Sequence, residues 1–390
     1  MHWRKFQADN IFDGEKILPK DRVVICNEEG RVEEIVDSNA AGDEVQHLNG
    51  IISPGFINCH CHLELSHMKG LIPEKTGLVD FVFSIVTQRH FPDEEIYDAI
   101  EIAESEMQKN GIVAVGDICN NLLTFSQKSK HNLQYYNFIE SSGWHPDIAN
   151  SRIERSKNYY DAFKEIAHSS IVPHAPYSVS DNLWKLIQPY FENKVVSIHN
   201  QETNFEDELF IQNSGDFVRM YKMMNIDTAF YMPTGKSSLQ SYFAKLQQAA
   251  QVILVHNTFT QQADIDFVKY SEQVKHVSFC LCPNANLYIE NALPPIELLC
   301  KNDCRIVLGT DSLASNHSLS ILDEMKTIQQ HFPSISLEEM LRWATKNGAK
   351  ALQMDDSLGS LQKGKQPGLV LIENVAADEL TNASAMRRLF

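Results

Sequence analysis

Long apolar runs are absent from this sequence, and so is the pattern of an export signal. No stretch of about 18 consecutive apolar residues occurs, which argues against a membrane-spanning helix. The opening residues, MHWRKFQADNIF, do not lead into an apolar segment, so a cleaved signal peptide is not expected either. We therefore expect a cytoplasmic protein with no membrane partner.

Positive charge is also scarce. The chain has 34 lysines and arginines against 51 aspartates and glutamates, which gives a formal net charge of −17. Nucleic acids and anionic membranes bind basic surfaces, so this balance argues against both as partners. With 390 residues, 43% of them hydrophobic, the chain is long enough for a large α/β domain and a minor one. An enzyme with a small-molecule substrate is the natural expectation.

Cysteine is too sparse for a disulfide-stapled fold, since the chain has eight in 390 residues. Two pairs, Cys59 with Cys61 and Cys280 with Cys282, have the spacing C-x-C within apolar, strand-like segments. Thiolate zinc sites typically use C-x-x-C in turns, so this spacing does not favour one. We expect reduced, buried thiols.

Both ends of the chain have the sequence pattern of short strands joined by turns. Residues 6–52 alternate apolar and polar runs, and Asn-Glu-Glu-Gly at 27–30 predicts a hairpin turn between VVIC and RVEEIV. Residues 357–373 have the same strand-turn-strand pattern. We therefore predict a small composite β-domain, a β-sandwich built from residues 1–54 and 357–390.

The middle of the chain, residues 55–356, alternates apolar strands with amphipathic helical stretches such as EEIYDAIEIAESEMQKNG and LSILDEMKTIQQHF. Eight such strands predict a (β/α)8 barrel, a TIM-like catalytic domain. The predicted strands lie at residues 51–60, 112–119, 133–140, 169–175, 194–200, 251–257, 276–284 and 305–311.

Polar residues stand at the C-terminal ends of these strands, where the active sites of such barrels are built. In the first strand, the period of two directs His60 and His62 to one side, so the pair forms half of a metal site. A lone histidine at a strand end is more often a core residue, but the combination of H-x-H, H-x-x-E, H and T-D-S is specific. The strand-end residues are His60, His62, Asp117, Glu140, His174, His199, His256 and Asp311.

Together these motifs resemble the amidohydrolase superfamily, in its cytosine deaminase, chlorohydrolase and nucleoside deaminase branch. The resemblance runs from IFDGEKIL through PGFINCHCH, PHAPYSVS, HNQET, LVHN, CPNANLYIENALPP and LGTDS to NGAKAL and GSLQKGKQPGLVLIE. It implies that one divalent metal, commonly zinc and sometimes iron, binds to four residues. It further implies that Glu202 shuttles a proton and that His256 contacts the bound water. The implied ligands are His60, His62, His199 and Asp311.

The chemistry of these residue types agrees with that implication. Three neutral imidazoles and one carboxylate leave a divalent metal with net positive charge, which acidifies bound water. Asp311 can accept the proton from that water, and His256 can stabilise the charge that develops during attack. Glu202, three residues beyond His199, can protonate a ring nitrogen of the substrate. The alternative for Glu202 is a solvated loop acid beside other acids at 206–208.

Substrate contacts are predicted from position. The segment IVPHAPYS has no lysine at the place where binuclear relatives carry a bridging one, so we expect one metal and a His174 that contacts substrate or supports a ligand. The stretch HLELSHMKGLIPEKTGLVDFVFSIVTQRH is expected to form a lid, in which Glu64 or Asp80 holds a ribose diol. Phe81 and Phe83 would supply apolar cover. CPNANLYIENALPP departs from the relatives' C-P-x-S-N pattern, although Asn284 and Asn286 could keep its contacts.

These observations predict a metal-dependent hydrolytic deaminase. The lid entry H-L-E-L-S resembles aminodeoxyfutalosine deaminase-like members, so an adenine-type nucleoside such as aminodeoxyfutalosine or adenosylhomocysteine is the leading substrate. One alternative keeps the fold and metal but cleaves a C–Cl or cyclic amide bond. A second, a non-catalytic barrel scaffold, predicts erosion of the ligand set, which is intact. A homodimer remains open, as does the choice of zinc or iron.

Overall fold

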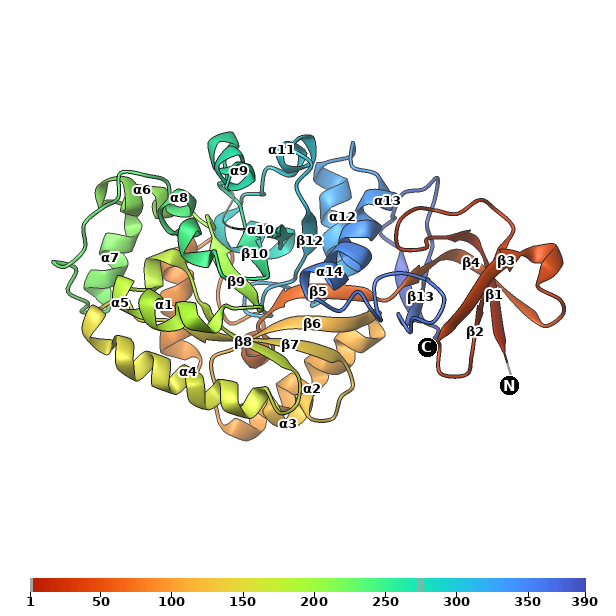
Figure 1. The fold of residues 1–390 in the computed structure, drawn as a ribbon, viewed down its shortest axis with the longest axis horizontal. Helices are drawn as coiled ribbons and strands as arrows, with labels where there is room; N and C mark the ends of the chain where they lie inside the picture. The colour runs from red at the N-terminus through yellow and green to blue at the C-terminus, as the bar shows by residue number, and fades with distance from the viewer. Residues whose placement is uncertain (1–2, 272–273, 275) are drawn as a thin grey trace.

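The computed structural model describes residues 3–271, 274 and 276–390. Figure 1 shows a large body of strands and helices and, at one end, a small sheet that contains both chain termini. The large body holds eight parallel strands that follow one another in chain order. They are β5 (Phe56–Cys61), β6 (Ile112–Cys119), β7 (Gln134–Ser141), β8 (His168–Pro173), β9 (Val195–Asn200), β10 (Gln251–His256), β11 (Val277–Leu281) and β12 (Ile306–Leu308).

The eight strands close into a barrel through two seams. Strands β5 to β8 form one four-stranded sheet and β9 to β12 form another. A parallel bridge between Cys61 and Asp311 joins β5 to β12. On the other side, the backbone N–H of His199 donates to the carbonyl of His174, 3.0 Å away. The predicted (β/α)8 barrel is therefore confirmed.

The sequences of the barrel strands are nearly continuous apolar runs, because helices cover the outer face of the barrel and bury these strands on both sides. Helix α2 (Asp93–Lys109) buries Ile96, Ile100 and Met107, whose spacing places them on one face. Helix α12 (Ile321–His331) is also amphipathic, so both helical stretches predicted from the sequence are confirmed. The other helices are α1 (Leu78–Gln88), α3 (Phe125–Lys128), α4 (Ala149–Phe163), α5 (Asp181–Ile187), α6 (Phe205–Gln212), α7 (Asp216–Met223), α8 (Ser238–Tyr242), α9 (Gln262–Lys269), α10 (Pro283–Glu290), α11 (Ile296–Lys301), α13 (Leu337–Arg342) and α14 (Gly348–Ala351).

The small sheet joins the two ends of the chain. Its strands are β1 (Arg4–Ile11), β2 (Arg22–Cys26), β3 (Val32–Asp37), β4 (Val45–Pro54), β13 (Leu369–Glu373) and β14 (Ala385–Arg388), in the order β14-β13-β4-β1-β2-β3. β13 pairs antiparallel with β4, and β2 pairs with β3 across the predicted hairpin turn. These six strands belong to one sheet, so the sandwich stays a prediction, as do the domain limits at 54 and 357.

Two further observations concern the whole chain. Within the described ranges, no helix has both the length and the apolar character needed to cross a membrane. All eight cysteines are free thiols, six of them buried.

Candidate active site

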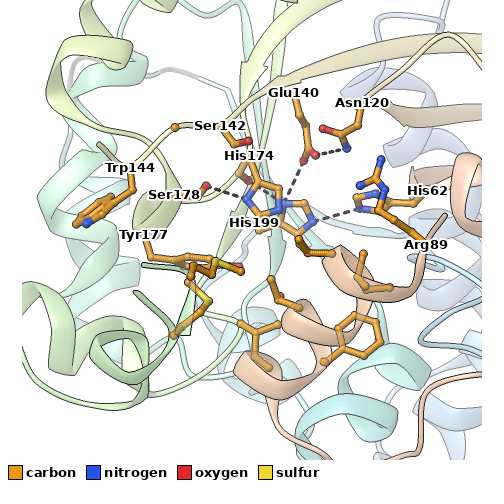
Figure 2. Close-up of a pocket in the computed structure, with 18 of the residues that line it drawn as sticks. His62, Arg89, Asn120, Glu140, Ser142, Trp144, His174, Tyr177, Ser178 and His199 are labelled. Carbon is orange, nitrogen blue, oxygen red and sulfur yellow. Dashed lines mark hydrogen bonds and ion pairs between the residues drawn. The ribbon is translucent and has the colours of Figure 1, made fainter. Parts of the chain in front are cut away.

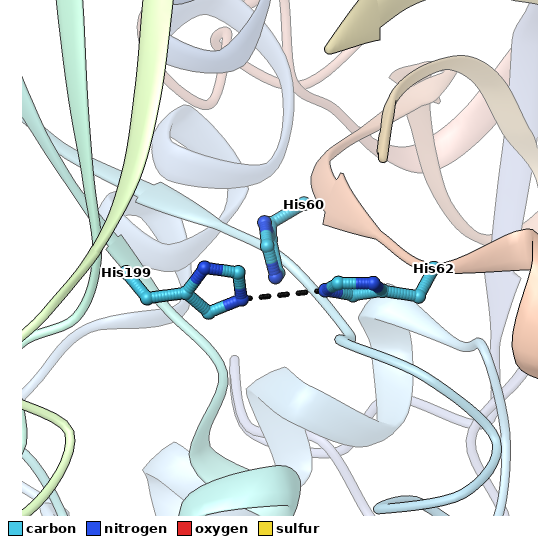
Figure 3. A group of neighbouring side chains, drawn as sticks. All are labelled: His60, His62 and His199. Atoms are coloured by element: carbon cyan, nitrogen blue, oxygen red, sulfur yellow. Dashed lines mark hydrogen bonds between the residues drawn. The ribbon is translucent and has the colours of Figure 1, made fainter. Parts of the chain in front are cut away.

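The four residues expected to bind a metal converge at the C-terminal end of the barrel. His60 lies in β5 and His62 directly after it, His199 lies in β9, and Asp311 follows β12. Nε2 of His62 is 3.3 Å from Nε2 of His199 and 3.5 Å from Oδ1 of Asp311. Nε2 of His60 is also 3.5 Å from that oxygen. Figure 3 shows the three imidazoles turned toward one another.

The donor set fits a divalent metal. The ligand atoms of the three histidines all lie within 4.8 Å of one another, and the side chains are buried. Both ring nitrogens of His60 and Nδ1 of His62 have no hydrogen-bond partner within the described part of the chain. Buried polar atoms without partners are costly unless something else binds them. Three imidazoles and one carboxylate are a typical set for zinc.

The charge state of these residues suits a metal as well. Burial lowers the pKa of His62 and of His199 well below the usual range, so both are neutral, the form in which imidazole binds a metal. Burial alone would raise the pKa of Asp311, but the imidazoles of His60 and His62, each with Nε2 3.5 Å from its Oδ1, hold it well below its usual range. Ser315 Oγ donates to Oδ2 of Asp311 at 2.6 Å, which leaves Oδ1 facing the histidines.

Neighbouring groups fix the orientation of His199. Its Nδ1 lies 2.8 Å from the backbone carbonyl of His174, and this contact places the ring proton on Nδ1. The carboxylate of Glu140 lies 3.4 Å from the same nitrogen. Nε2 is therefore the nitrogen left free to face the cluster. Such partners commonly set the tautomer of a metal-binding histidine.

Backbone strain marks two of the strand ends. His256 has φ of +73° and Asp311 has φ of +57°, both unusual for residues with side chains. Asn257, also at positive φ, holds the first of these turns: its side-chain amide donates to the carbonyls of Leu254 at 2.8 Å and Cys280 at 3.1 Å. These turns direct both functional side chains inward.

Glu202 and His256 face each other beside the cluster. Nε2 of His256 is 3.5 Å from Oε1 of Glu202, and both residues are buried. Burial, followed by the charges of Asp311 and Glu206, raises the pKa of Glu202 well above its usual range. Glu202 is therefore a buried carboxyl in surroundings that favour its protonated form, and not a solvated loop acid.

Two further residues hold this pair in place. The carboxylate of Glu206 accepts the backbone N–H of Gln201 at 3.0 Å and that of Glu202 at 2.9 Å. Burial lowers the pKa of His256 to about 3, so its ring is neutral. Asn286 Nδ2 lies 3.2 Å from Nδ1 of His256, and because an amide NH₂ donates, the ring proton sits on Nε2. Asn284 instead contacts Glu324 and Thr327.

A cavity of about 530 Å³ opens onto this end of the barrel. Its volume is within the range of small-molecule sites. Figure 2 shows His174, Glu140 and Tyr177 on its wall. Nδ1 of His174 lies 2.8 Å from Ser178 Oγ, and burial followed by the nearby His60 lowers its pKa to about 4. His174 is therefore neutral and lines the cavity.

The two carboxylates expected to hold a diol have different positions. Glu64 is buried in the cavity wall, where its oxygens accept the backbone N–H of Asn120 at 2.9 Å and its side-chain amide at 3.0 Å. Asp80 is exposed and pairs with Arg219 at 2.8 Å, outside the lining of the cavity. Among its neighbours, Phe81 lines the cavity and Phe83 does not. The structure thus does not bring Asp80 to the site.

Three arginines and two aromatic side chains of the cavity wall were not predicted from the sequence. Arg89, Arg152 and Arg155 line the cavity, together with Trp144 and Tyr177. Part of this wall could have been predicted from the sequence, because Arg152 and Arg155 lie three residues apart on a predicted helix in a chain poor in basic residues. Which face of that helix turns inward could not be read from its sequence.

Known proteins share both sequence and fold with this chain. The 5-methylthioadenosine/S-adenosylhomocysteine deaminase of Saccharophagus degradans is 27% identical over 95% of this chain and 84% of its own length. The structure of Helicobacter pylori aminofutalosine deaminase with methylthio-coformycin superimposes with a TM-score of 0.79 at 23% identity, over 97% and 93% of the two chains. A zinc-bound adenosine deaminase from Xanthomonas campestris gives a TM-score of 0.73 at 20% identity, over 95% and 84%. Residues 51–386 match the amidohydrolase family. The chain therefore belongs to the amidohydrolase family.

Proposed function

We propose that this protein is a metal-dependent deaminase that hydrolyses the exocyclic amino group of an adenine-type nucleoside and releases ammonia. The observation that carries the proposal is the buried carboxyl of Glu202, 3.5 Å from Nε2 of His256, at the edge of a cluster of side chains that could hold a metal. The names of the similar deaminases support the choice of substrate class. The intact donor set speaks against the non-catalytic scaffold.

We assign the metal to His60, His62, His199 and Asp311, because their ligand atoms meet in one buried cluster. A divalent ion there would acidify a water molecule and so supply the nucleophile. Zinc suits this donor set, and the zinc-bound relative supports that choice, while iron accepts the same ligands. One metal is proposed, since His174 stands in the segment where binuclear relatives carry a lysine.

The chain's own residues would then divide the proton transfers. Asp311, held ionised, accepts the proton of the attacking water. Glu202, held protonated, donates to the ring nitrogen beside the carbon under attack, which makes that carbon more electrophilic. His256 donates a hydrogen bond from Nε2 and stabilises negative charge on the attacking oxygen. Asp311 then passes the proton of the water to the amino group, the carbon–nitrogen bond breaks and ammonia leaves, and the remaining hydroxyl proton restores Glu202.

The cavity supplies candidate contacts for the rest of the nucleoside. We propose that His174 contacts the heterocycle and that Glu64 accepts hydrogen bonds from the ribose hydroxyls. Both side chains line the cavity, and Glu64 is held in place by Asn120. Asp80, engaged with Arg219, is not part of this proposal.

The location and assembly of the protein are proposed on fewer observations. Free thiols at all eight cysteines support the reducing cytoplasm. The net charge of −17 supports a small-molecule partner and not a nucleic acid. A homodimer stays a prediction.

The first test measures ammonia release by the zinc-loaded protein across adenine, guanine, cytosine, pterin and triazine compounds. We expect release from adenine nucleosides, and we expect Glu202→Gln to lower kcat by about 10²- to 10⁴-fold because a neutral amide cannot donate and recover the proton. Glu208→Gln, in the neighbouring helix α6, is the matched control and should stay close to wild type.

Chloride release from a chlorinated triazine, with no ammonia from any nucleoside, would instead support the chlorohydrolase alternative. Failure of the purified chain to bind stoichiometric metal would revive the scaffold alternative. Equal activity of Glu202→Gln and wild type on an adenine nucleoside would remove Glu202 from the mechanism.

A further inference from the structure

One asparagine lies between the proposed sugar contact and the proposed metal site. Asn120 directly follows β6, the neighbouring strand β5 leads to Glu64, and Glu140 lies near the end of β7, the neighbour on the other side. Parallel strands in a barrel have their carboxyl ends on one side, so these three residues lie next to one another around the opening. All three line the cavity, and Figure 2 shows Asn120 beside Glu140.

The side-chain amide of Asn120 bonds to both carboxylates at once. Its Nδ2 donates to Oε1 of Glu64 at 3.0 Å and to Oε2 of Glu140 at 2.9 Å, and its backbone N–H donates to Oε2 of Glu64 at 2.9 Å. An amide NH₂ group has two hydrogens, so each of the two side-chain contacts takes one. Because an ionised carboxylate offers acceptors only, the NH₂ end of the amide must face the two glutamates.

Few other groups hold these two carboxylates. Glu64 and Glu140 are each 2% exposed. Within the described ranges, every hydrogen bond that the side chain of Glu64 accepts comes from Asn120. Over the same part of the chain, Asn120 and His199 are the only side chains that hydrogen-bond or ion-pair with the carboxylate of Glu140. Buried carboxylates are costly without such donors, so the orientation of both depends on Asn120.

The second oxygen of Glu140 lies beside a proposed metal ligand. It is 3.4 Å from Nδ1 of His199, the ring nitrogen that faces away from the cluster. A carboxylate in this position fixes the ring and makes the opposite nitrogen a stronger donor to a metal. Glu64, on the other side of the amide, is the proposed acceptor for the ribose hydroxyls. Asn120 therefore contacts the carboxylate behind the metal ligand and the carboxylate that faces the sugar.

We infer that Asn120 is a positioning residue whose single amide aligns the sugar acceptor Glu64 and the metal-ligand partner Glu140. This inference rests on the proposed function, which places the ribose at Glu64 and the metal at His199. It requires that one substitution at Asn120 weakens two separate properties, the recognition of the ribose hydroxyls and the affinity for the metal. A residue that only stabilises its loop would not change these two properties selectively.

The test measures zinc affinity and sugar recognition in the same variants. Competition with a chromophoric chelator gives the zinc Kd. Sugar recognition is the ratio of kcat/KM for adenosine to kcat/KM for 2′,3′-dideoxyadenosine, which lacks both hydroxyls. For the wild type we expect a ratio of about 100, since each of two hydrogen bonds to a carboxylate is worth about a factor of ten.

Asn120→Ala should change both quantities. We expect the zinc Kd to rise about 10-fold, the effect of losing a group that supports a metal-binding histidine. We expect the ratio to fall about 10-fold, mainly through KM, because Glu64 loses one of its two donors. Asn120→Asp, which keeps the shape of the side chain but has no NH₂ group, should show the same two losses.

The two glutamates separate the two effects. Glu64→Gln should lower the ratio and leave the zinc Kd unchanged, whereas Glu140→Gln should raise the zinc Kd and leave the ratio unchanged. In the double variant Asn120→Ala with Glu140→Gln, the zinc Kd should match that of Glu140→Gln within about twofold, because both changes act through one contact.

The matched control is Asn121→Ala, which removes the next asparagine of the same loop. Its side chain accepts the backbone N–H of Leu123 at 2.9 Å and is not part of the cavity wall. The zinc Kd and the ratio should stay at their wild-type values in this variant. Urea unfolding of the metal-free variants checks that each is folded.

Three results would overturn the inference while leaving deamination intact. They are a wild-type zinc Kd in both Asn120 variants, an unchanged ratio in both, and losses of the same size in Asn121→Ala. The absence of ammonia from adenosine and from every other adenine nucleoside would instead reject the proposed function.

Discussion

Single side chains in this site differ in charge state from the same residues in water. Burial, and then the charges of nearby carboxylates, raise the pKa of Glu202, whereas the surrounding histidines lower the pKa of Asp311 despite its burial. The two carboxyl groups, one a proposed metal ligand and the other three residues beyond one, thus differ in the way that the proposed proton transfers require. Such divergence of pKa between neighbouring acids is typical of catalytic sites.

The buried histidines predict how stability depends on pH. The pKa of His174 falls from 6.5 to about 4 on folding because of burial, so the unfolded chain binds a proton more readily than the folded one. Its contribution to stability is fully present above pH 6.5 and is lost as the pH falls toward 4, about 3 kcal/mol in all. Urea unfolding of the metal-free protein should therefore show falling stability over this window.

His174→Asn provides the comparison, because asparagine does not titrate. The loss between pH 6.5 and 4 should be smaller in this variant by up to the same amount. His331→Asn, at an exposed position on α12, is the control and should follow the wild type. An identical pH dependence in His174→Asn and wild type would show that His174 titrates normally in the folded protein.

At the scale of helices and strands, not every residue at a strand end lines the cavity. Asp117, at the end region of β6, points to a buried lysine on α3: its Oδ2 is 2.6 Å from Nζ of Lys128, and both side chains are fully buried. Its other oxygen accepts the backbone N–H of Leu63 at 2.9 Å, directly after His62. The sequence grouped Asp117 with the cavity residues, but it supports the strand that carries the histidines.

This buried ion pair predicts a large effect of removing one partner. Lys128→Met should lower the free energy of unfolding by about 3–5 kcal/mol, because it leaves Asp117 buried without its cation. The double variant Lys128→Met with Asp117→Asn should recover part of that loss. Urea denaturation measures both, with exposed Lys130→Met as control. A loss below about 1 kcal/mol in the single variant would mean that Asp117 becomes neutral or hydrated at little cost.

At the scale of the whole molecule, the barrel gathers residues from positions 60 to 311 at one opening. Three buried imidazoles meet there, and in the described part of the chain both ring nitrogens of His60 and Nδ1 of His62 have no hydrogen-bond partner. The native state is thus expected to be stabilised by a metal ion that the unfolded chain binds less well. Ligand binding to the folded state alone adds about 4 kcal/mol when free metal exceeds its Kd a thousandfold.

Metal removal tests this expectation. Chelation should lower the Tm by several degrees, and added zinc should restore it, in a fluorescence or calorimetric melt. Asp311→Ala should show a smaller shift between chelated and zinc-loaded samples, since one ligand is missing. The same Tm with and without zinc in the wild type would contradict a metal at this cluster.

Much of this architecture could be predicted from local patterns. Eight apolar runs separated by amphipathic helices predicted the barrel, because strand period and helix period are properties of short segments. The polar residues that end those strands predicted which side chains would meet, because parallel strands in a closed barrel have their carboxyl ends on one side. His60, His62, His199, His256 and Asp311 were picked out in this way, whereas Glu202 was picked out by its H-x-x-E spacing from His199.

Tertiary packing decided the rest. The sequence could not tell that Asp80 turns outward to Arg219 or that Arg152 and Arg155 turn inward, because the rotation of a helix depends on what it packs against. Nor could it separate Asp117, paired with Lys128, from the strand ends that face the cavity. Protonation states also depend on burial and on charges brought together from distant segments. The sequence by itself determined the fold and the candidate metal-ligand residues through local periodicity, whereas the lining of the cavity and the charge states depended on long-range packing.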